Sequence, residues 1–244
     1  MKVALVCIAK NEDNYITEWV NYHKKIGFDS IFIYENNWSC SIEDPKVTKI
    51  RFDGKPKQIE SYNHFYENYI DFDWVAFFDV DEFLVLKKHK NIKDFLKDYK
   101  DYLSVGINWV LFGDNGINHV GDDYSVIKRF TKRQIGVDQH IKSIVNLNRC
   151  KSKMGVHSPE CKWVDPDKIL NEGPYNKNGN DNIVQINHYF CKTKDEFINK
   201  IEKGRSDDGK FRDISEFDVH NKNETLDLNA YNFFIDDNNS LFNT

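Results

Sequence analysis

Apolar and polar positions alternate between strand-like and helix-like patterns along the first third of the chain. Short continuous apolar runs are typical of strands buried on both faces, and apolar residues three and four apart are typical of a helix packed on a sheet. The predicted elements here are a strand at 3–8, a helix at 16–26, strands at 30–34 and 47–52, and a helix at 59–70. This order predicts an α/β fold with a mostly parallel central sheet flanked by helices.

The remaining chain continues in the same style but with longer loops. Further expected elements are a helix at 91–99, strands at 104–112, 125–130, 143–147 and 183–190, and a helix that a Thr193–Glu196 capping box opens and Gly204 closes. Residues 151–182 are rich in glycine and proline and are expected to form loops. We therefore expect one α/β domain over 1–205, followed by a polar extension over 206–244 that could carry one short helix.

The segment 73–83 contains the strongest candidate for a functional site, a pair of acids after an apolar run. Five apolar residues run directly into Asp79-Val80-Asp81, so the acids are expected at the carboxyl end of a buried strand, where open α/β sheets bind ligands. Alternate residues of an extended segment point the same way, so Asp79 and Asp81 could converge on one hard cation. The alternative is an ordinary acidic turn after a strand.

Composition narrows the classes of function. The chain has 244 residues and a formal net charge of −5, with scattered lysines, which argues against nucleic acid as a partner. No apolar stretch approaches the roughly 20 residues of a membrane span, and the first apolar run is too short for a signal peptide. The five cysteines form no C-x-x-C pair, which predicts free thiols in the cytoplasm.

An ordered set of short motifs over residues 3–205 resembles GT-A fold glycosyltransferases, in the bacterial branch similar to glycosyltransferase families 2 and 92. The motifs are Ala9-Lys10-Asn11-Glu12, Glu18–His23, Gln58 with Tyr62-Asn63, Asp79–Phe83, Trp109 with Phe112-Gly113, Lys142–Val145, His157 and Asn187-His188-Tyr189. The resemblance implies transfer of a sugar, with inversion, from a nucleoside diphosphate sugar (a UDP-sugar is favoured) to a glycan or glycolipid hydroxyl. It also implies Mn²⁺ or Mg²⁺, and work on a surface polysaccharide in the cytoplasm or at the inner face of the membrane.

The resemblance also assigns residues. Asp81, Asp79 and His188 would ligate the metal. The donor would be contacted by residues near the sheet rim, namely Asn11, Glu12, Asn36, Asp53, Gln58, Asn63, Asp79 and Lys142. Lys142, Lys200 and Arg205 could neutralise the diphosphate. Each of these side chains also has an ordinary structural role open to it, such as helix capping for Asn11 and Glu12.

The general base is not marked by a motif, because the Glu-Asp pair usual in family 2 is missing. Asp114, in a loop between Gly113 and Gly116, and Glu160 are the candidate catalytic carboxylates. Asp138 and Asp165 are the next candidates.

Two other classes of function share features with this chain. A haloacid-dehalogenase-type phosphatase also places D-x-D after a buried strand, but it opens the chain with that motif, whereas two β-α units come first here. A non-catalytic module that binds a sugar nucleotide or a glycan is the other alternative.

Overall fold

The computed structural model describes residues 1–54, 57–205 and 207–235. Its strands are β1 (Val3–Ala9), β2 (Ser30–Glu35), β3 (Val47–Arg51), β4 (Trp74–Phe77), β5 (Glu82–Leu86), β6 (Ser104–Leu111), β7 (Lys132–Arg133), β8 (Ile141–Asn146), β9 (Trp163–Val164), β10 (Leu170–Asn171), β11 (Val184–His188) and β12 (Thr225–Leu226). Its helices are α1 (Ile16–Ile26), α2 (Gln58–Asn68), α3 (Ile92–Lys97), α4 (Val126–Arg129), α5 (Lys194–Lys203), α6 (Ser215–His220) and α7 (Asn229–Ile235).

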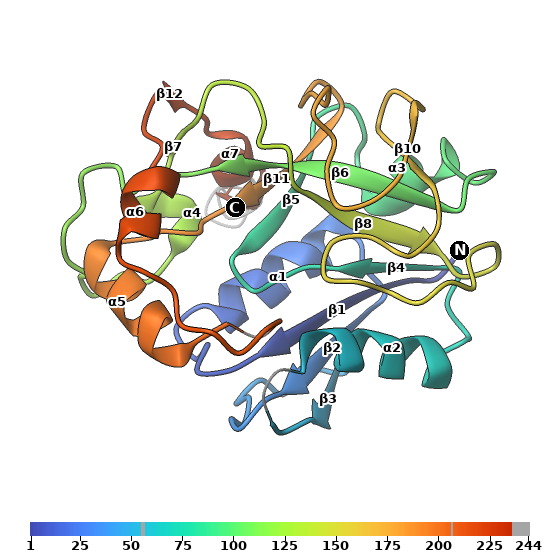
Figure 1. The fold of residues 1–244 in the computed structure, drawn as a ribbon, viewed down its shortest axis with the longest axis horizontal. Helices are drawn as coiled ribbons and strands as arrows, with labels where there is room; N and C mark the ends of the chain where they lie inside the picture. The colour runs from blue at the N-terminus through green and yellow to red at the C-terminus, as the bar shows by residue number, and fades with distance from the viewer. Residues whose placement is uncertain (55–56, 206, 236–244) are drawn as a thin grey trace, which may run out of the picture.

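The central sheet has a parallel half and a mixed half. Strands β3, β2, β1 and β4 are neighbours in that order and all run parallel. Strand β8 then pairs antiparallel with both β4 and β6. The far end of β6 pairs with β11, which in turn pairs with β5. This arrangement confirms the predicted α/β class (Figure 1).

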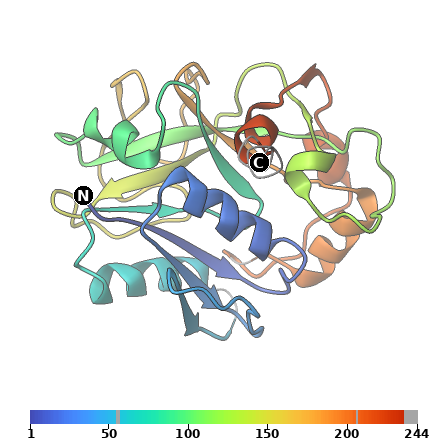
Figure 2. The same cartoon turned by 180° about the vertical axis from the view of Figure 1, so that it is seen from behind.

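Strand β1 is buried on both faces, as its unbroken apolar run predicts. Its odd-numbered residues Val3, Leu5 and Cys7 join the core cluster that includes α1, whereas Ala4 and Val6 join the cluster that includes α2. The two helices accordingly cover opposite faces of the sheet, with α1 in front in the reverse view (Figure 2). Helix α1 ends where predicted, because Gly27 takes a left-handed conformation with φ of 108° that costs glycine little.

The segment around the acids departs from the expected single strand. Strand β4 ends at Phe77, and Asp79 lies in a tight turn in which the Glu82 N–H donates to the Asp79 carbonyl at 3.0 Å. Strand β5 then begins at Glu82 and leaves the parallel sheet to pair with β11. The two acids are therefore presented by a turn rather than by an extended strand.

The prediction of a strand at 125–130 was wrong, because residues 126–129 form the short helix α4. The Ser125 side chain accepts a hydrogen bond from the Lys128 N–H, which caps this helix. The carboxylate of Glu18, from α1, accepts from the Val126 N–H at 2.8 Å and from the Ser125 hydroxyl. Glu18, which is distant in sequence, thus accepts hydrogen bonds from the first turn of α4. The alternation of apolar and polar residues over 125–130 could not reveal this contact.

The residues after 205 pack back onto the sheet domain. Strand β12 pairs with β7, and the described part of the segment carries two helices, α6 and α7. The carboxylate of Asp114 holds this segment in place, since it accepts hydrogen bonds from Asn221 and Asn223 at 3.0 Å each.

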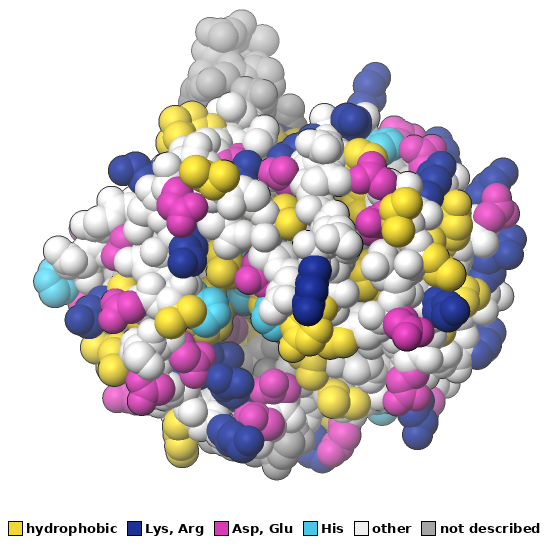
Figure 3. All heavy atoms as spheres, turned by 45° about the horizontal axis from the view of Figure 1, so that its top comes forward, with side chains coloured by type: hydrophobic (Ala, Val, Ile, Leu, Met, Phe, Trp, Pro, Cys, Tyr) yellow, Lys and Arg dark blue, Asp and Glu magenta, His cyan; other side chains and the backbone are white. Residues whose placement is uncertain are grey.

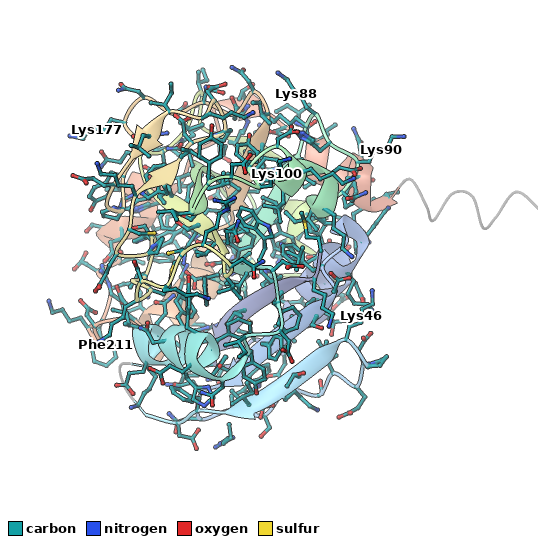
Figure 4. All side chains as sticks on the ribbon, turned by 90° about the vertical axis from the view of Figure 1, so that its right-hand side faces the viewer. Lys46, Lys88, Lys90, Lys100, Lys177 and Phe211 are labelled. Carbon is teal, nitrogen blue, oxygen red and sulfur yellow. The ribbon has the colours of Figure 1, made fainter. Side chains whose placement is uncertain are left out.

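Charged side chains are spread over the surface. Lysines such as Lys46, Lys88, Lys100 and Lys177 extend outward from different parts of the molecule (Figure 4). Within the described residues, no helix is long and apolar enough to cross a membrane. All five cysteines are free thiols, and four of them are buried.

Candidate active site

The acidic turn is fixed from both ends. The Asp79 N–H donates to the Glu82 carboxylate at 2.8 Å, so the third acid of the turn folds back to hold the first. The Tyr189 N–H donates to the Asp81 carbonyl at 2.9 Å, which ties the turn to the end of β11. These backbone contacts place the Asp79 and Asp81 carboxylates at the carboxyl end of β4, as the sheet-rim rule predicts.

Asp79 is held by a buried lysine and a glutamine. Its Oδ2 lies 3.0 Å from Nζ of Lys142, and its Oδ1 accepts from the Gln58 amide at 2.8 Å. Lys142 is fully buried and also lies 3.7 Å from Glu82. Burial lowers the pKa of Lys142, but Asp79 and Glu82 raise it more, so the ammonium stays charged. Lys142 therefore fixes the position of the Asp79 carboxylate.

Asp81 faces a different set of partners. Its Oδ2 accepts from Lys200 on α5 at 2.7 Å, and its Oδ1 lies 3.6 Å from Nε2 of His188. Burial raises the pKa of Asp81, but the Lys200 ammonium, with His188 beside it, leaves that pKa well below the usual range. Burial lowers the pKa of His188 in spite of Asp81, which favours the neutral imidazole that binds metals.

A cavity of about 550 Å³ opens above this turn. Figure 3 shows histidine side chains gathered near the centre of one face of the molecule. The ends of β1 and β2, the start of α2 and the acidic turn form one part of the lining. The rest comes from β6, the segment before β8, β11, α5 and the segment after α5. The charged and aromatic residues of the lining are Lys10, Glu12, Lys57, Asp79, Asp81, Trp109, His140, His157, His188, Phe190, Lys200, Lys203, Arg205, Asp207, Arg212, Glu216 and His220.

Three imidazoles surround the Trp109 ring in this cavity. The ring centroid of Trp109 lies 4.2 Å from that of His188, 5.0 Å from that of His140 and 5.1 Å from that of His157. Trp109 belongs to β6, whose other residues are buried, but Trp109 is only half-buried and lines the cavity. One wall of the cavity is thus flat and aromatic, which suits contact with a sugar ring.

Another part of the wall is basic. Lys200, Lys203, Arg205 and Arg212 all line it, and they come from α5 and the segment that follows. Lys203 pairs with Glu12, which joins the end of α5 to the loop after β1. Clustered Lys and Arg side chains beside a cavity suit an anionic group such as a diphosphate.

Eight of the residues predicted from the sequence line the cavity. They are Glu12, Asn36, Gln58, Asp79, Asp81, His188, Lys200 and Arg205. Asn36 is nearly buried, and its amide donates to the Phe52 and Gly54 carbonyls at 2.9 and 2.8 Å. Its amide group therefore fixes the loop after β3, while another part of the residue faces the cavity.

The other predicted donor contacts make structural bonds outside the lining. Asp53 pairs with Arg51 at 2.7 Å, and Asn63 bonds the backbone of Met154, which pins the 150s loop to α2. Asn11 is exposed, with a left-handed backbone. Lys142 lies beneath the cavity, behind Asp79.

Both predicted catalytic carboxylates also lie outside the lining. Asp114 is bonded to the segment after α6, as described above. Glu160 is exposed in the loop before β9, where its N–H donates to the Lys153 carbonyl. Of the next candidates, Asp165 is buried and accepts from the backbone of its own turn.

Sequence reasoning missed several lining residues that come from the segment after α5. Lys203, Arg212, Glu216 and His220 belong to this group. The rule that ligands bind at the carboxyl ends of strands does not identify these residues. They reach the cavity only because the C-terminal segment packs against it. The five basic residues between 200 and 212 are a signal that could have pointed to Lys203 and Arg212.

Asp81 and His188 fit a divalent cation. Two atoms that bind one ion at about 2.1–2.2 Å lie roughly 3–3.6 Å apart, and Oδ1 of Asp81 and Nε2 of His188 are 3.6 Å apart, too far for a hydrogen bond. Within the described residues, no group of three or more His, Cys, Asp or Glu could hold a metal. Two protein ligands suffice for an ion that takes its remaining ligands from phosphate and water.

An acidic turn at the carboxyl end of a parallel strand faces a cavity with a basic wall, which agrees with the predicted resemblance to glycosyltransferases. The family model of glycosyltransferase family 92 matches residues 56–226, and the chain belongs to this family. This match confirms the predicted resemblance to glycosyltransferases.

Curated relatives carry the same family name. A glycosyltransferase family 92 protein of Ricinus communis is 26% identical over 218 residues, which are 82% of this chain and 37% of that protein. One of Oryza sativa subsp. japonica is 26% identical over 210 residues, 80% of this chain and 34% of that protein. The chain thus spans little more than a third of the length of these relatives.

Among solved structures, S. aureus TarS 1–349 is similar with a TM-score of 0.36 and 16% identity, over 60% of this chain and 47% of that one. HddC from Yersinia pseudotuberculosis is similar with a TM-score of 0.35 and 11% identity, over 59% and 77%.

Proposed function

We propose that this chain transfers a sugar, with inversion, from a nucleoside diphosphate sugar to a hydroxyl group of a glycan acceptor, in the presence of Mn²⁺ or Mg²⁺. The observation that carries the proposal is the pairing of Asp81 and His188 beside a basic wall in one cavity. Membership in glycosyltransferase family 92 supports it. A UDP-sugar donor and a role in surface polysaccharide synthesis remain part of the proposal.

Each part of the lining has a place in this reaction. Asp81 and His188 would hold the ion, which when bound stabilises charge on the departing diphosphate. Lys203, Arg205 and Arg212 would bind the diphosphate oxygens, while the ends of β1 and β2 would receive the nucleoside. Trp109 would pack against a sugar ring. Lys142 and Gln58 keep Asp79 in place and leave its position independent of the ligand.

The two alternatives predict different behaviour. A phosphatase of the haloacid dehalogenase type would use Asp79 as a nucleophile, but the Asp79 carboxylate is occupied by Lys142 and Gln58, and the chain belongs to another family. A non-catalytic binding module would bind a nucleoside diphosphate sugar without releasing the diphosphate.

Release of nucleoside diphosphate from a panel of donors, with and without Mn²⁺ and with mixed glycan acceptors, tests the proposal. We expect one donor to be consumed only with the metal, and Asp81→Asn to lose that turnover because it keeps the shape of the side chain but not its charge. Binding without release would favour the module, and turnover unaffected by chelator or by Asp81→Asn would contradict metal dependence.

A further inference from the structure

His140 lines the cavity beside Trp109 and is paired with Asp138 behind it. Oδ1 of Asp138 lies 2.7 Å from Nδ1 of His140 and accepts the His140 N–H at 2.8 Å. Since a carboxylate can only accept, Nδ1 carries the proton and Nε2 keeps its lone pair. Among the described residues, no hydrogen-bond partner occupies Nε2, and the His140 ring lines the cavity.

The pair is mounted rigidly on β6. The Asp138 N–H donates to the Trp109 carbonyl at 2.8 Å, and the Trp109 N–H donates to the His140 carbonyl at 3.0 Å. The Asn108 amide donates to the Asp138 carbonyl at 2.9 Å. The His140 ring stacks on Trp109 at an interplanar angle of 27° and meets Tyr175 edge-on. The imidazole is therefore held in one orientation before any ligand binds.

The indole ring of Trp109 contacts His140 and also contacts His188, which lies beside the acidic turn. The centroid distances of 4.2 and 5.0 Å together cap the separation of the two imidazoles at about 9 Å. The sugar of a donor whose diphosphate lies at Asp81 and His188 would therefore be within reach of His140.

The carboxylates of the cavity are already engaged by cations. Glu12, Asp81 and Glu216 are paired with Lys203, Lys200 and Arg205, in that order, and Asp79 is paired with Lys142. The remaining one, Asp207, interacts electrostatically with Arg205. A carboxylate held by a cation is not free to turn toward an acceptor hydroxyl.

The neighbouring His157 is also a weaker candidate. Its Nδ1 bonds the Ile141 carbonyl at 3.0 Å rather than a carboxylate. Burial, followed by the charge of Lys142, lowers the pKa of His157 to about 3. In contrast, the Asp138 carboxylate beside His140 would stabilise the imidazolium that forms when a proton is taken.

We propose that His140 is the general base of this chain and that Asp138 is its positioning residue, an assignment that rests on the proposed sugar transfer. Nε2 of His140 takes the proton of the acceptor hydroxyl as the oxygen forms its bond to the anomeric carbon. The bond from that carbon to the diphosphate oxygen breaks, and its electron pair leaves on the diphosphate. The imidazolium then returns the proton to solvent.

The test compares His140→Gln and Asp138→Asn with the wild-type chain, using the donor that the wild type consumes. We expect kcat to fall roughly 10²–10⁴-fold for His140→Gln and about 10–100-fold for Asp138→Asn. The donor KM and the Mn²⁺-dependent binding of the nucleoside diphosphate, measured by calorimetry, should be unchanged. Added imidazole should restore part of the turnover of His140→Ala, which a purely structural role would not allow.

The matched control is the His119–Asp195 pair, which has the same 2.7 Å contact through Nδ1 but lies outside the cavity lining. His119→Gln and Asp195→Asn should turn over donor at the wild-type rate. Near-wild-type kcat in His140→Gln, or a loss of nucleotide binding as large as the loss of kcat, would overturn the assignment. A wild-type chain that consumes no donor would overturn the proposed transfer and the base with it. If His140→Gln does not fold, the imidazole experiment on His140→Ala or His140→Asn decides.

Discussion

The ammonium of Lys142 lies 3.0 Å from the carboxylate of Asp79, in a site where the lysine side chain is fully buried. Glu82, also buried, shares the same ammonium at 3.7 Å. Burial raises the pKa of Glu82 well above its usual range, although Lys142 opposes that effect. One buried cation therefore holds two acids of the turn, and the turn depends on it.

Lys142→Met should destabilise the fold. It leaves Asp79 and Glu82 together without their cation, and breaking a buried ion pair on one side costs about 3–5 kcal/mol. The midpoint of urea unfolding measures this loss. Lys88→Met, at an exposed lysine, is the control and should change stability by less than about 0.5 kcal/mol. Equal midpoints for the two variants would show that the pair carries no net stability.

His188→Ala should weaken the binding of Mn²⁺ in the presence of a nucleoside diphosphate by at least about tenfold, since even partners of metal ligands are worth that much. Calorimetric titration of the metal checks this. His64→Ala is the matched control, because His64 bonds Tyr34 outside the cavity lining. It should lower thermal stability without changing metal affinity. The same loss of stability in both variants with intact metal binding would make His188 a structural residue.

Acid stability should depend on Glu196 in the capping box of α5. Burial raises the pKa of Glu196, but Arg129, Tyr15 and Thr193 outweigh it and lower the pKa to about 2 from an ordinary value of 4.5. Because the folded pKa is the lower one, this group stabilises the fold fully above about pH 4.5, and the contribution is lost as pH falls toward 2.

Glu196→Gln should therefore lose roughly 2–3 kcal/mol at pH 7, and the difference from wild type should shrink as pH falls from 4.5 to 2. Urea unfolding across this pH range measures it. Glu67→Gln, at an exposed acid, should follow the wild-type curve. A gap between Glu196→Gln and wild type that stays constant with pH would mean that packing, not charge, causes the loss.

Cys150 and Cys161 should form a disulfide under mild oxidation, although the sequence predicts free thiols. Their sulfur atoms lie 2.8 Å apart, and the hydrogen bond from Cys161 lowers the pKa of Cys150, which favours the reactive thiolate. Oxidised glutathione would accept the two electrons and leave as two thiols. Mass spectrometry should detect the linked peptides. Cys40→Ser should still form the link, and Cys150→Ser should not; a link found in Cys150→Ser would point to another pair.

The sequence by itself determined the parallel half of the sheet and the place of the acids. Unbroken apolar runs in β1 and β4, and helical spacing in α1 and α2, leave few other arrangements, because each pattern buries its apolar residues in only one kind of element. Because ligands bind at the carboxyl ends of parallel strands, the position of Asp79 and Asp81 after the apolar run of β4 predicts that both lie at a ligand site.

Only the tertiary structure decided which side chains meet those acids. Lys200 and His140 reach the cavity from elements far along the chain, and neither strand periodicity nor capping signals encode such contacts. Lys142, expected at the donor, lies beneath Asp79 instead, because a strand residue faces one side or the other and β8 turns this one inward. Alternation in the sequence reports that a side chain is buried or exposed, whereas its partner depends on how distant elements pack.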